Sequence, residues 1–232
     1  MLTYTYIPKT MIEADFLSAT EFRICAVLHS YSFFDNVFPS IAEIKAKARV
    51  AESTVFRAIQ KFEELGFITK KSRFKADGGQ SSNEYIFNYG GWDAWYSNKF
   101  GSNDKQQYIG EKVKLVKISD DTQISVYENK ILATKCFNDF LYTDKLDASE
   151  IRTFLYLKQF SNRKEVYSSY KMLSAKVNIS KPIIIRTMNS LSEKSLVMKL
   201  NDEEITNVSG TTKYLILNDL ELENWVKNSK DS

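Results

Sequence analysis

The side chains with the clearest chemistry are hydrogen-bond donors suited to phosphates and to the edges of bases. Cations fill most of the positions from 70 to 75: Lys70, Lys71, Arg73 and Lys75. Earlier in the chain, Arg57 and Gln60 stand three positions apart. A guanidinium can donate to both O6 and N7 of guanine, and a glutamine amide can pair with adenine. Because lysines and arginines also bind the phosphate backbone, this combination predicts contact with duplex DNA.

Two short helices joined by a tight turn are predicted to position these donors. Ser40 and Glu43 have the spacing of a capping box that opens the first helix. Its apolar face consists of Ile41, Ile44 and Ala48. A turn at 49–51 leads into a second helix from about 52 to 65, which Gly66 suits as a C-cap. The inward stripe of the second helix is predicted to be Val55, Ile59, Phe62 and Leu65.

A β-hairpin is predicted after the second helix. Residues 67–75 are predicted to form its first strand, which carries the four cations. The sequence Asp-Gly-Gly-Gln at 77–80 predicts a turn, and residues 84–87 form the returning strand. The cations of positions 70–75 therefore lie on the hairpin.

The order helix, turn, helix and hairpin resembles the winged helix-turn-helix family, which is found in plasmid and phage replication initiators and in many regulators. Residues 38–40, 50–59 and 65–68 carry the resemblance. It implies that the second helix enters the major groove and that the hairpin, or wing, follows the phosphate backbone or the minor groove. This sequence departs from the family at Ala51 and Glu52, where members usually have a serine and basic residues.

The resemblance implies DNA contacts from the helices and the wing of this first unit. The helix contacts are Ser40, Ser53, Thr54, Arg57, Gln60 and Lys61. The wing contacts are Lys70, Lys71, Arg73 and Lys75. The alternative is that these are solvated surface residues and that the lysines guard an edge strand against aggregation.

The second half of the chain repeats the first at a constant offset of 129 positions. Leu-Ser-Ala-Thr-Glu-Phe-Arg at 17–23 aligns with Leu-Asp-Ala-Ser-Glu-Ile-Arg at 146–152. The apolar core positions stay in register, so a second module of the same kind is predicted. Its DNA-facing helix spans about 181–191, and its candidate contacts are Ser180, Lys181, Arg186 and Asn189.

The second module differs from the first on its predicted surface. Ile183 and Ile185 replace Thr54 and Phe56, so apolar atoms are expected on the outside of the helix. The wing at 201–204 is acidic, and carboxylates repel phosphate. This module therefore reads DNA by its helix alone, or it is partly given over to protein contact.

The predicted fold is mainly α with small β-hairpin wings, an α+β class made of two tandem winged helix-turn-helix domains. The first domain is expected at 1–98 and the second at 123–232, with a connector at 99–122. Residues 111–119 are expected to form a strand or a structured connector. The residues at 92–96 are expected to form a helical turn that packs on the first domain, with a polar linker at 97–107.

Composition narrows the class of protein. The chain has 232 residues, of which 43% are hydrophobic and 26% charged, as expected for a soluble globular protein. No apolar run of about 18 residues and no signal peptide is visible, so a cytoplasmic protein without a membrane span is expected. The net charge is only +3, so any positive patch must be local.

Catalytic and metal-binding chemistry have little support. Cys25 and Cys136 are far apart and are expected to be buried free thiols, and His29 is the only histidine. A structural zinc site needs about four ligands, and no phosphate-binding loop or hydrolase motif is present. Asp120, Asp121 and the acids at 202–204 are interpreted as solvated loop residues. We therefore expect no enzyme, no metal and no cofactor.

The function expected from the sequence is sequence-specific binding of double-stranded DNA. The tandem architecture resembles that of replication initiators, which bind repeated origin sites and recruit host replication proteins. One alternative is a transcriptional regulator, such as a repressor of a mobile element. Another is a protein-interaction adaptor that uses winged helices to dimerise. A homodimer and host replication proteins are the other partners considered.

Overall fold

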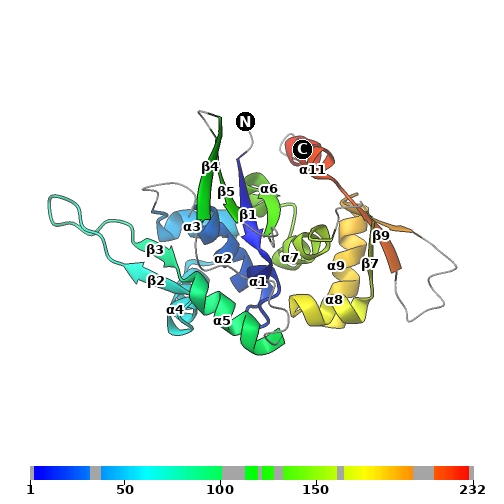
Figure 1. Ribbon diagram of the computed structural model, residues 1–232, viewed down its shortest axis with the longest axis horizontal. Helices are drawn as coiled ribbons and strands as arrows, with labels where there is room; N and C mark the ends of the chain where they lie inside the picture. The colour runs from blue at the N-terminus through cyan, green and yellow to red at the C-terminus, as the bar shows by residue number, and fades with distance from the viewer. Residues whose placement is uncertain are drawn as a thin grey trace.

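The computed structural model describes residues 3–31, 38–100, 113–119, 122–127, 133–160, 165–200 and 212–229 (Figure 1). These residues form a mixed α+β fold with small antiparallel sheets, so the α+β class predicted from the sequence is confirmed. The division into 1–98, 99–122 and 123–232 stays a prediction. The acidic run at 201–204 and the pair Asp120 and Asp121 lie outside the described residues.

The first half of the chain contains the predicted pair of helices and the hairpin. Its elements are β1 (Tyr4–Pro8), α1 (Lys9–Ile12), α2 (Ala19–Tyr31), α3 (Ile41–Ala48), α4 (Glu52–Glu64), β2 (Ile68–Lys71), β3 (Glu84–Phe87) and α5 (Tyr89–Phe100). An antiparallel pair, β4 (Val113–Ser119) and β5 (Thr122–Tyr127), follows.

The second half repeats this order with one added strand. Its elements are β6 (Ala133–Phe137), α6 (Asn138–Tyr142), α7 (Ala148–Lys158), β7 (Glu165–Ser168), α8 (Tyr170–Val177), α9 (Lys181–Glu193), β8 (Val197–Leu200), β9 (Thr212–Ile216) and α11 (Asp219–Asn228). The added strand is β7, which pairs with β9. The bounds of α8, α9 and β8 are those of α3, α4 and β2 moved by 129 positions, without a change in length. The structure therefore has the internal repeat that the sequence predicts.

Local chemistry explains where the repeated helices begin and turn. Capping boxes open α2, α3 and α7: Ser18 with Glu21, Ser40 with Glu43, and Asp147 with Glu150. The turns after α3 and α8 place Arg49 and Asn178 in the left-handed region, with φ of 58° and 49°. After α4, Gly66 has φ of 71°, and Ser195 takes φ of 60° at the same place after α9. This conformation suits glycine and strains serine.

A two-stranded ribbon joins the halves at their N-terminal ends. β1 and β6 pair in antiparallel fashion, and Tyr6 lies opposite Lys135 at the centre of the ribbon. These two residues occupy the same position in the two copies of the repeat. An approximate twofold axis therefore passes through the middle of the ribbon and relates one half to the other.

Two buried arginines, Arg23 on α2 and Arg152 on α7, connect the halves across this axis. Each donates three hydrogen bonds to main-chain carbonyl oxygens of the other half. Arg23 binds those of Leu141, Thr143 and Leu146 at 3.2, 2.5 and 3.0 Å. Arg152 binds those of Ile12, Ala14 and Leu17 at 2.9, 2.6 and 2.6 Å. Each acceptor of Arg23 is the repeat equivalent of an acceptor of Arg152, and we call this reciprocal arrangement the arginine clamp.

The arginine clamp keeps two cations inside the protein. Arg152 is fully buried and Arg23 is 3% exposed. Burial lowers the pKa of each guanidinium to about 10, so both arginines remain charged at neutral pH. The acceptors lie in the segments that run from the ends of α1 and α6 to the residues just before α2 and α7. Ile12 and Leu141 belong to helix ends, whose carbonyls lack partners within the helix. Each arginine therefore satisfies three carbonyl groups, and those groups offset the cost of burying its charge.

The turn between the two helices of each module also contacts the other half. Nε of Arg49 donates to the carbonyl oxygen of Tyr142 at 3.2 Å, and Nζ of Lys47 lies 4.7 Å from the centre of the Tyr142 ring. In the second module, the side chain of Asn178 donates to the carbonyl oxygen of Asp15. Because α4 and α9 follow these turns directly, their positions depend on the interface between the halves.

Helix α5 is longer than the sequence predicted. Instead of a turn at 92–96, it runs to Phe100, so the polar stretch predicted as a linker at 97–107 begins inside a helix. Trp92 is buried, with its ring 4.4 Å from that of Phe67, and the ring of Trp95 lies 5.0 Å from that of Phe16. These aromatic contacts hold the start of α5 on the first half, and the helix then continues through the polar residues that follow Trp95.

Replacing Arg152 by methionine should lower the free energy of unfolding by about 3 kcal/mol or more, because three buried carbonyl oxygens lose donors that are worth about 1–3 kcal/mol each. Denaturant titration measures the change. The matched control is Arg186→Met on the exposed side of α9, which should stay within about 0.5 kcal/mol of wild type. Equal effects of the two substitutions would contradict a structural role for the clamp.

Candidate nucleic-acid interface

Helix α4 buries one face and exposes the opposite one. Val55, Ala58, Ile59 and Phe62 are buried, as expected for its inward stripe. The prediction that Leu65 faces inward is wrong, because this residue is 44% exposed. Regular helix ends at Glu64, so Leu65 is the C-cap residue and lies beyond the part of α4 that covers the core.

The outward face of α4 carries several of the predicted DNA contacts. Ser53, Arg57 and Gln60 are exposed, and Thr54 is half-buried. Nε of Arg57 donates to the carbonyl oxygen of Ser53 at 3.3 Å, and the amide of Gln60 donates to Glu64 at 2.8 Å. These donors lie on the first turns and the middle of the helix, within reach of an approaching partner.

Lys61 does not share this outward face. Its ammonium group donates to the carbonyl oxygen of Phe16 at 2.7 Å and to both carboxylate oxygens of Glu21 at 2.9 Å. Lys61 points to the flank of α4 that packs near the start of α2, so it connects two helices of the first module. We therefore leave it out of the interface proposed below.

Two residues at the starts of α3 and α4, Ser40 and Glu52, have partners within the protein that bear on their predicted contacts with phosphate. Ser40 is the N-cap of α3, and its hydroxyl accepts from the Glu43 amide at 3.2 Å while donating to the Glu43 carboxylate at 2.9 Å. The predicted capping box is confirmed, and the phosphate contact of Ser40 stays a prediction. Glu52, which would repel phosphate, lies 3.9 Å from the ammonium group of Lys45. This pairing weakens the negative charge at the start of α4.

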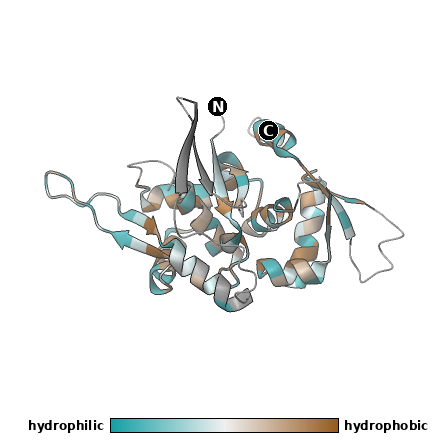
Figure 2. Cartoon of the chain, viewed as in Figure 1, coloured by the Kyte–Doolittle hydropathy of each residue, from teal (hydrophilic) through white to brown (hydrophobic). Residues whose placement is uncertain are grey.

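The hairpin β2–β3 projects from one end of the molecule (Figure 1) and is largely hydrophilic (Figure 2). Lys71 and Lys75 are exposed. Lys70 lies 3.2 Å from Glu63 of α4, and the guanidinium of Arg73 lies 3.4 Å from the centre of the Phe38 ring. The hairpin therefore presents cations to solvent, and two of them are also held by contacts with neighbouring residues.

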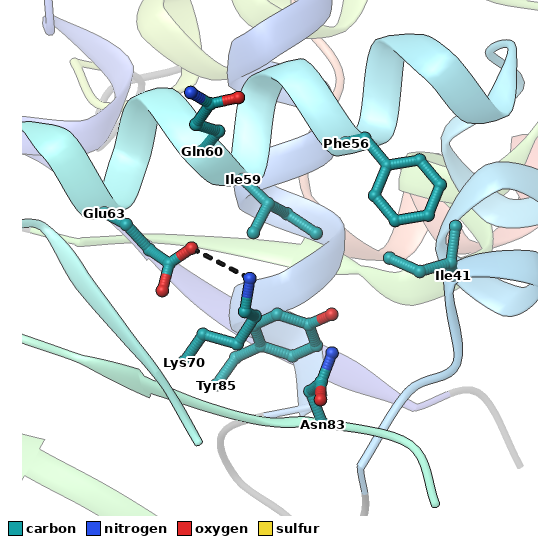
Figure 3. Close-up of a pocket in the computed structure, with 8 residues that line it drawn as sticks. All are labelled: Ile41, Phe56, Ile59, Gln60, Glu63, Lys70, Asn83 and Tyr85. Carbon is teal, nitrogen blue, oxygen red and sulfur yellow. Dashed lines mark ion pairs between the residues drawn. The ribbon is translucent and has the colours of Figure 1, made fainter. Parts of the chain in front are cut away.

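An open pocket of about 240 Å³ lies between α4 and the hairpin (Figure 3). It is lined by Ile41, Phe56, Ile59, Gln60, Glu63, Lys70, Asn83 and Tyr85. Phe56 is 54% exposed, although the DNA contacts predicted for the outer face from the sequence were all hydrogen-bond donors. Helical spacing could have found it, because Phe56 falls outside the buried stripe of Val55 and Ile59. The pocket brings the helix and the hairpin into one continuous surface.

In the second module, the exposed residues of α9 include the predicted Lys181, Arg186 and Asn189. Ser180 is the N-cap as expected, although its side chain makes no cap hydrogen bond, and proline follows in the first turn. Ile183 is 39% exposed, which confirms the predicted apolar surface. The acidic tip of this wing lies outside the described residues.

The remaining titratable candidates are buried. Cys25 and Cys136 are fully buried free thiols, and burial raises the pKa of both. His29 is also buried, with Nε2 3.0 Å from the Tyr89 hydroxyl, and burial lowers its pKa to about 3. Its ring is therefore neutral, and it packs inside the first half beside Tyr89. Within the described ranges, no three His, Cys, Asp or Glu side chains gather as metal ligands would.

Comparison with known proteins gives no family. The sequence matches no protein-family model and no curated protein. In the described part of the chain, no helix combines the length and the apolar character that crossing a membrane requires.

The structural role of Lys61 predicts a pH-dependent contribution from Glu21. Burial opposes ionisation of Glu21, but hydrogen bonds from Lys61 and Ser18 outweigh it, so the pKa of this carboxyl lies below its ordinary value. The ionised carboxylate therefore stabilises the fold above the unfolded pKa, about 4.3, and the contribution is lost as pH falls through the folded value.

We expect Glu21→Gln to be less stable than wild type near neutral pH by about 1 kcal/mol or less, because the pair is partly exposed to solvent. The difference should shrink as the pH falls through the folded pKa of Glu21. Denaturant titrations at several pH values measure it. A difference that stays constant with pH would contradict an ionic role for this pair.

Proposed function

We propose that this chain binds duplex DNA sequence-specifically through two tandem winged helix-turn-helix modules. The observation that carries the proposal is the exposed outer face of α4 beside a projecting cationic hairpin. The pocket lined by both elements and the ion pair between Lys70 and Glu63 make them one surface. A helix of this kind fits the major groove, while a basic hairpin can follow the neighbouring phosphates.

The charge of the chain is distributed as this function requires. The whole chain has a net charge of only +3, yet Lys70, Lys71, Arg73 and Lys75 lie within six positions. Asp77 and Glu84 are the only acidic residues on the hairpin between 68 and 87. Exposed clustered cations gain free energy by releasing the counterions of DNA, whatever its sequence. The hairpin is therefore the proposed source of affinity.

We propose replication initiation as the biological role, on the resemblance of the tandem architecture to plasmid and phage initiators. An initiator predicts directly repeated binding sites in the DNA beside its own gene. A repressor of a mobile element predicts one inverted repeat over its promoter. Unbiased selection of bound sequences, followed by a search for those sequences beside the gene, separates the two roles.

Arg57→Ala and Lys71→Ala should weaken DNA binding in different ways. Arg57→Ala removes a base contact, so we expect a loss of about 1–3 kcal/mol on the preferred site and poorer discrimination among sequences. Lys71→Ala removes a phosphate contact, so all duplexes lose affinity alike and the slope of log K against log salt falls by about one. Fluorescence anisotropy across a salt series measures both quantities.

The matched control is Lys227→Ala. Lys227 is a lysine of α11 that pairs with Glu223 at 2.8 Å, and it belongs to neither proposed interface. This variant should keep the affinity and the salt slope of wild type. Indistinguishable effects of Arg57→Ala and Lys71→Ala would count against the separate roles. A flat salt response would count against DNA binding itself and favour the adaptor.

If both modules bind one duplex, footprinting should show two protected segments with centres about 34 Å apart, one helical turn. Arg57→Ala should weaken protection of one segment, and Arg186→Ala that of the other. A single segment that Arg186→Ala leaves unchanged would show that the second module does not read DNA. Its exposed Ile183 and Met198, 39% and 60% exposed, would then favour a protein partner.

A further inference from the structure

Phe56 is the least expected residue on the outer side of α4. More than half of its surface is exposed, and it immediately precedes Arg57. Its ring is turned toward Ile41 at the start of α3, and the two side chains form an apolar wall of the pocket beside the hairpin (Figure 3). Single exposed hydrophobic residues are common, so the meaning of Phe56 depends on its place in the proposed interface.

The second module has an apolar residue at the same place. Ile185 is the repeat equivalent of Phe56 and is half-buried on α9, and Tyr170 is the equivalent of Ile41. Both modules therefore set a large apolar side chain beside their outward arginines, Arg57 and Arg186. The hydrophobic core does not explain a phenylalanine at position 56, because more than half of this residue stays exposed.

The surroundings of Phe56 suit an anionic partner that carries small apolar groups. Lys70 and Glu63, which pair at 3.2 Å, line the same pocket, and the exposed cations Lys71 and Lys75 lie further along the hairpin. In the major groove of DNA, the apolar group on a base edge is the C5-methyl of thymine, and phenylalanine is among the side chains that contact it. The cations of this surface could therefore meet the phosphates of duplex DNA while the Phe56 ring meets a thymine methyl group.

We propose that Phe56, supported by Ile41, receives a thymine methyl group, so that the site read by α4 contains a thymine at the position facing this ring. The inference rests on the proposed DNA-binding function and adds a base preference to it. Arg57, the next residue, is proposed to read guanine. The thymine and the guanine are therefore expected at neighbouring positions of the selected site.

Replacing thymine by uracil in the selected duplex tests this, because the change deletes only the methyl group. Each thymine is replaced in turn, and the dissociation constant is measured for wild type, Phe56→Ala and Phe56→Leu. We expect one replacement to weaken wild-type binding about fourfold, as for one buried methyl-sized group. Phe56→Leu should keep a preference for thymine at that position, and Phe56→Ala should bind both duplexes alike.

Phe160→Ala is the matched control, because Phe160 is a phenylalanine that is 47% exposed and belongs to neither proposed interface. It should keep the thymine preference of wild type, and thermal melting checks that each variant is folded. Wild type that binds its selected duplex but tolerates uracil at every position would overturn this inference alone. The inference would also fail if Phe56→Ala kept the preference. Wild type that selects no duplex would overturn the proposed function itself.

Discussion

The arginine clamp is the interaction on which the rest of the structure depends. Arg23 and Arg152 each carry a buried positive charge to the main-chain carbonyls of the other half, over a sequence separation of 118 to 140 residues. Burying a guanidinium is costly unless its donors are satisfied. Six carbonyl acceptors in a reciprocal arrangement meet this requirement, and they are positioned only when both halves are folded and docked. The clamp thereby couples the folding of the two halves to their mutual placement.

The two halves share the backbone pairing of the ribbon and the arginine clamp where they meet, and their side chains differ on the hairpins. The ribbon β1–β6 and the clamp keep their twofold relationship residue by residue. On the hairpins, Thr69 and Lys71 of the first half are replaced by Met198 and Leu200 in the second. The chain is therefore a pseudosymmetric frame with two unlike surfaces, and any two DNA half-sites it reads should be unlike in sequence.

Local chemistry in the sequence predicted much of each module. The capping pair Ser40 and Glu43, the turn at 77–80 and the stripe of Val55, Ile59 and Phe62 all act over a few residues, so spacing alone found them. The clamp could not be found this way, because Arg23 and Arg152 bind carbonyl oxygens, which every residue has. The directions of Lys61 and Leu65 were also missed. Both directions depend on what lies beside α4 in space. Lys61 turns toward Glu21, and Leu65 lies beyond the part of the helix that covers the core.

The donors on α4 constrain how selective this surface can be. Arg57 and Gln60 already donate to Ser53 and Glu64 within the helix. A contact with a base would exchange one hydrogen bond for another, and an exchange gains less than satisfying a group that has no partner. On the hairpin, Lys70 would have to leave Glu63, but counterion release at the exposed Lys71 and Lys75 requires no such exchange. In the proposed function, affinity should therefore come mainly from the hairpin and selectivity from α4.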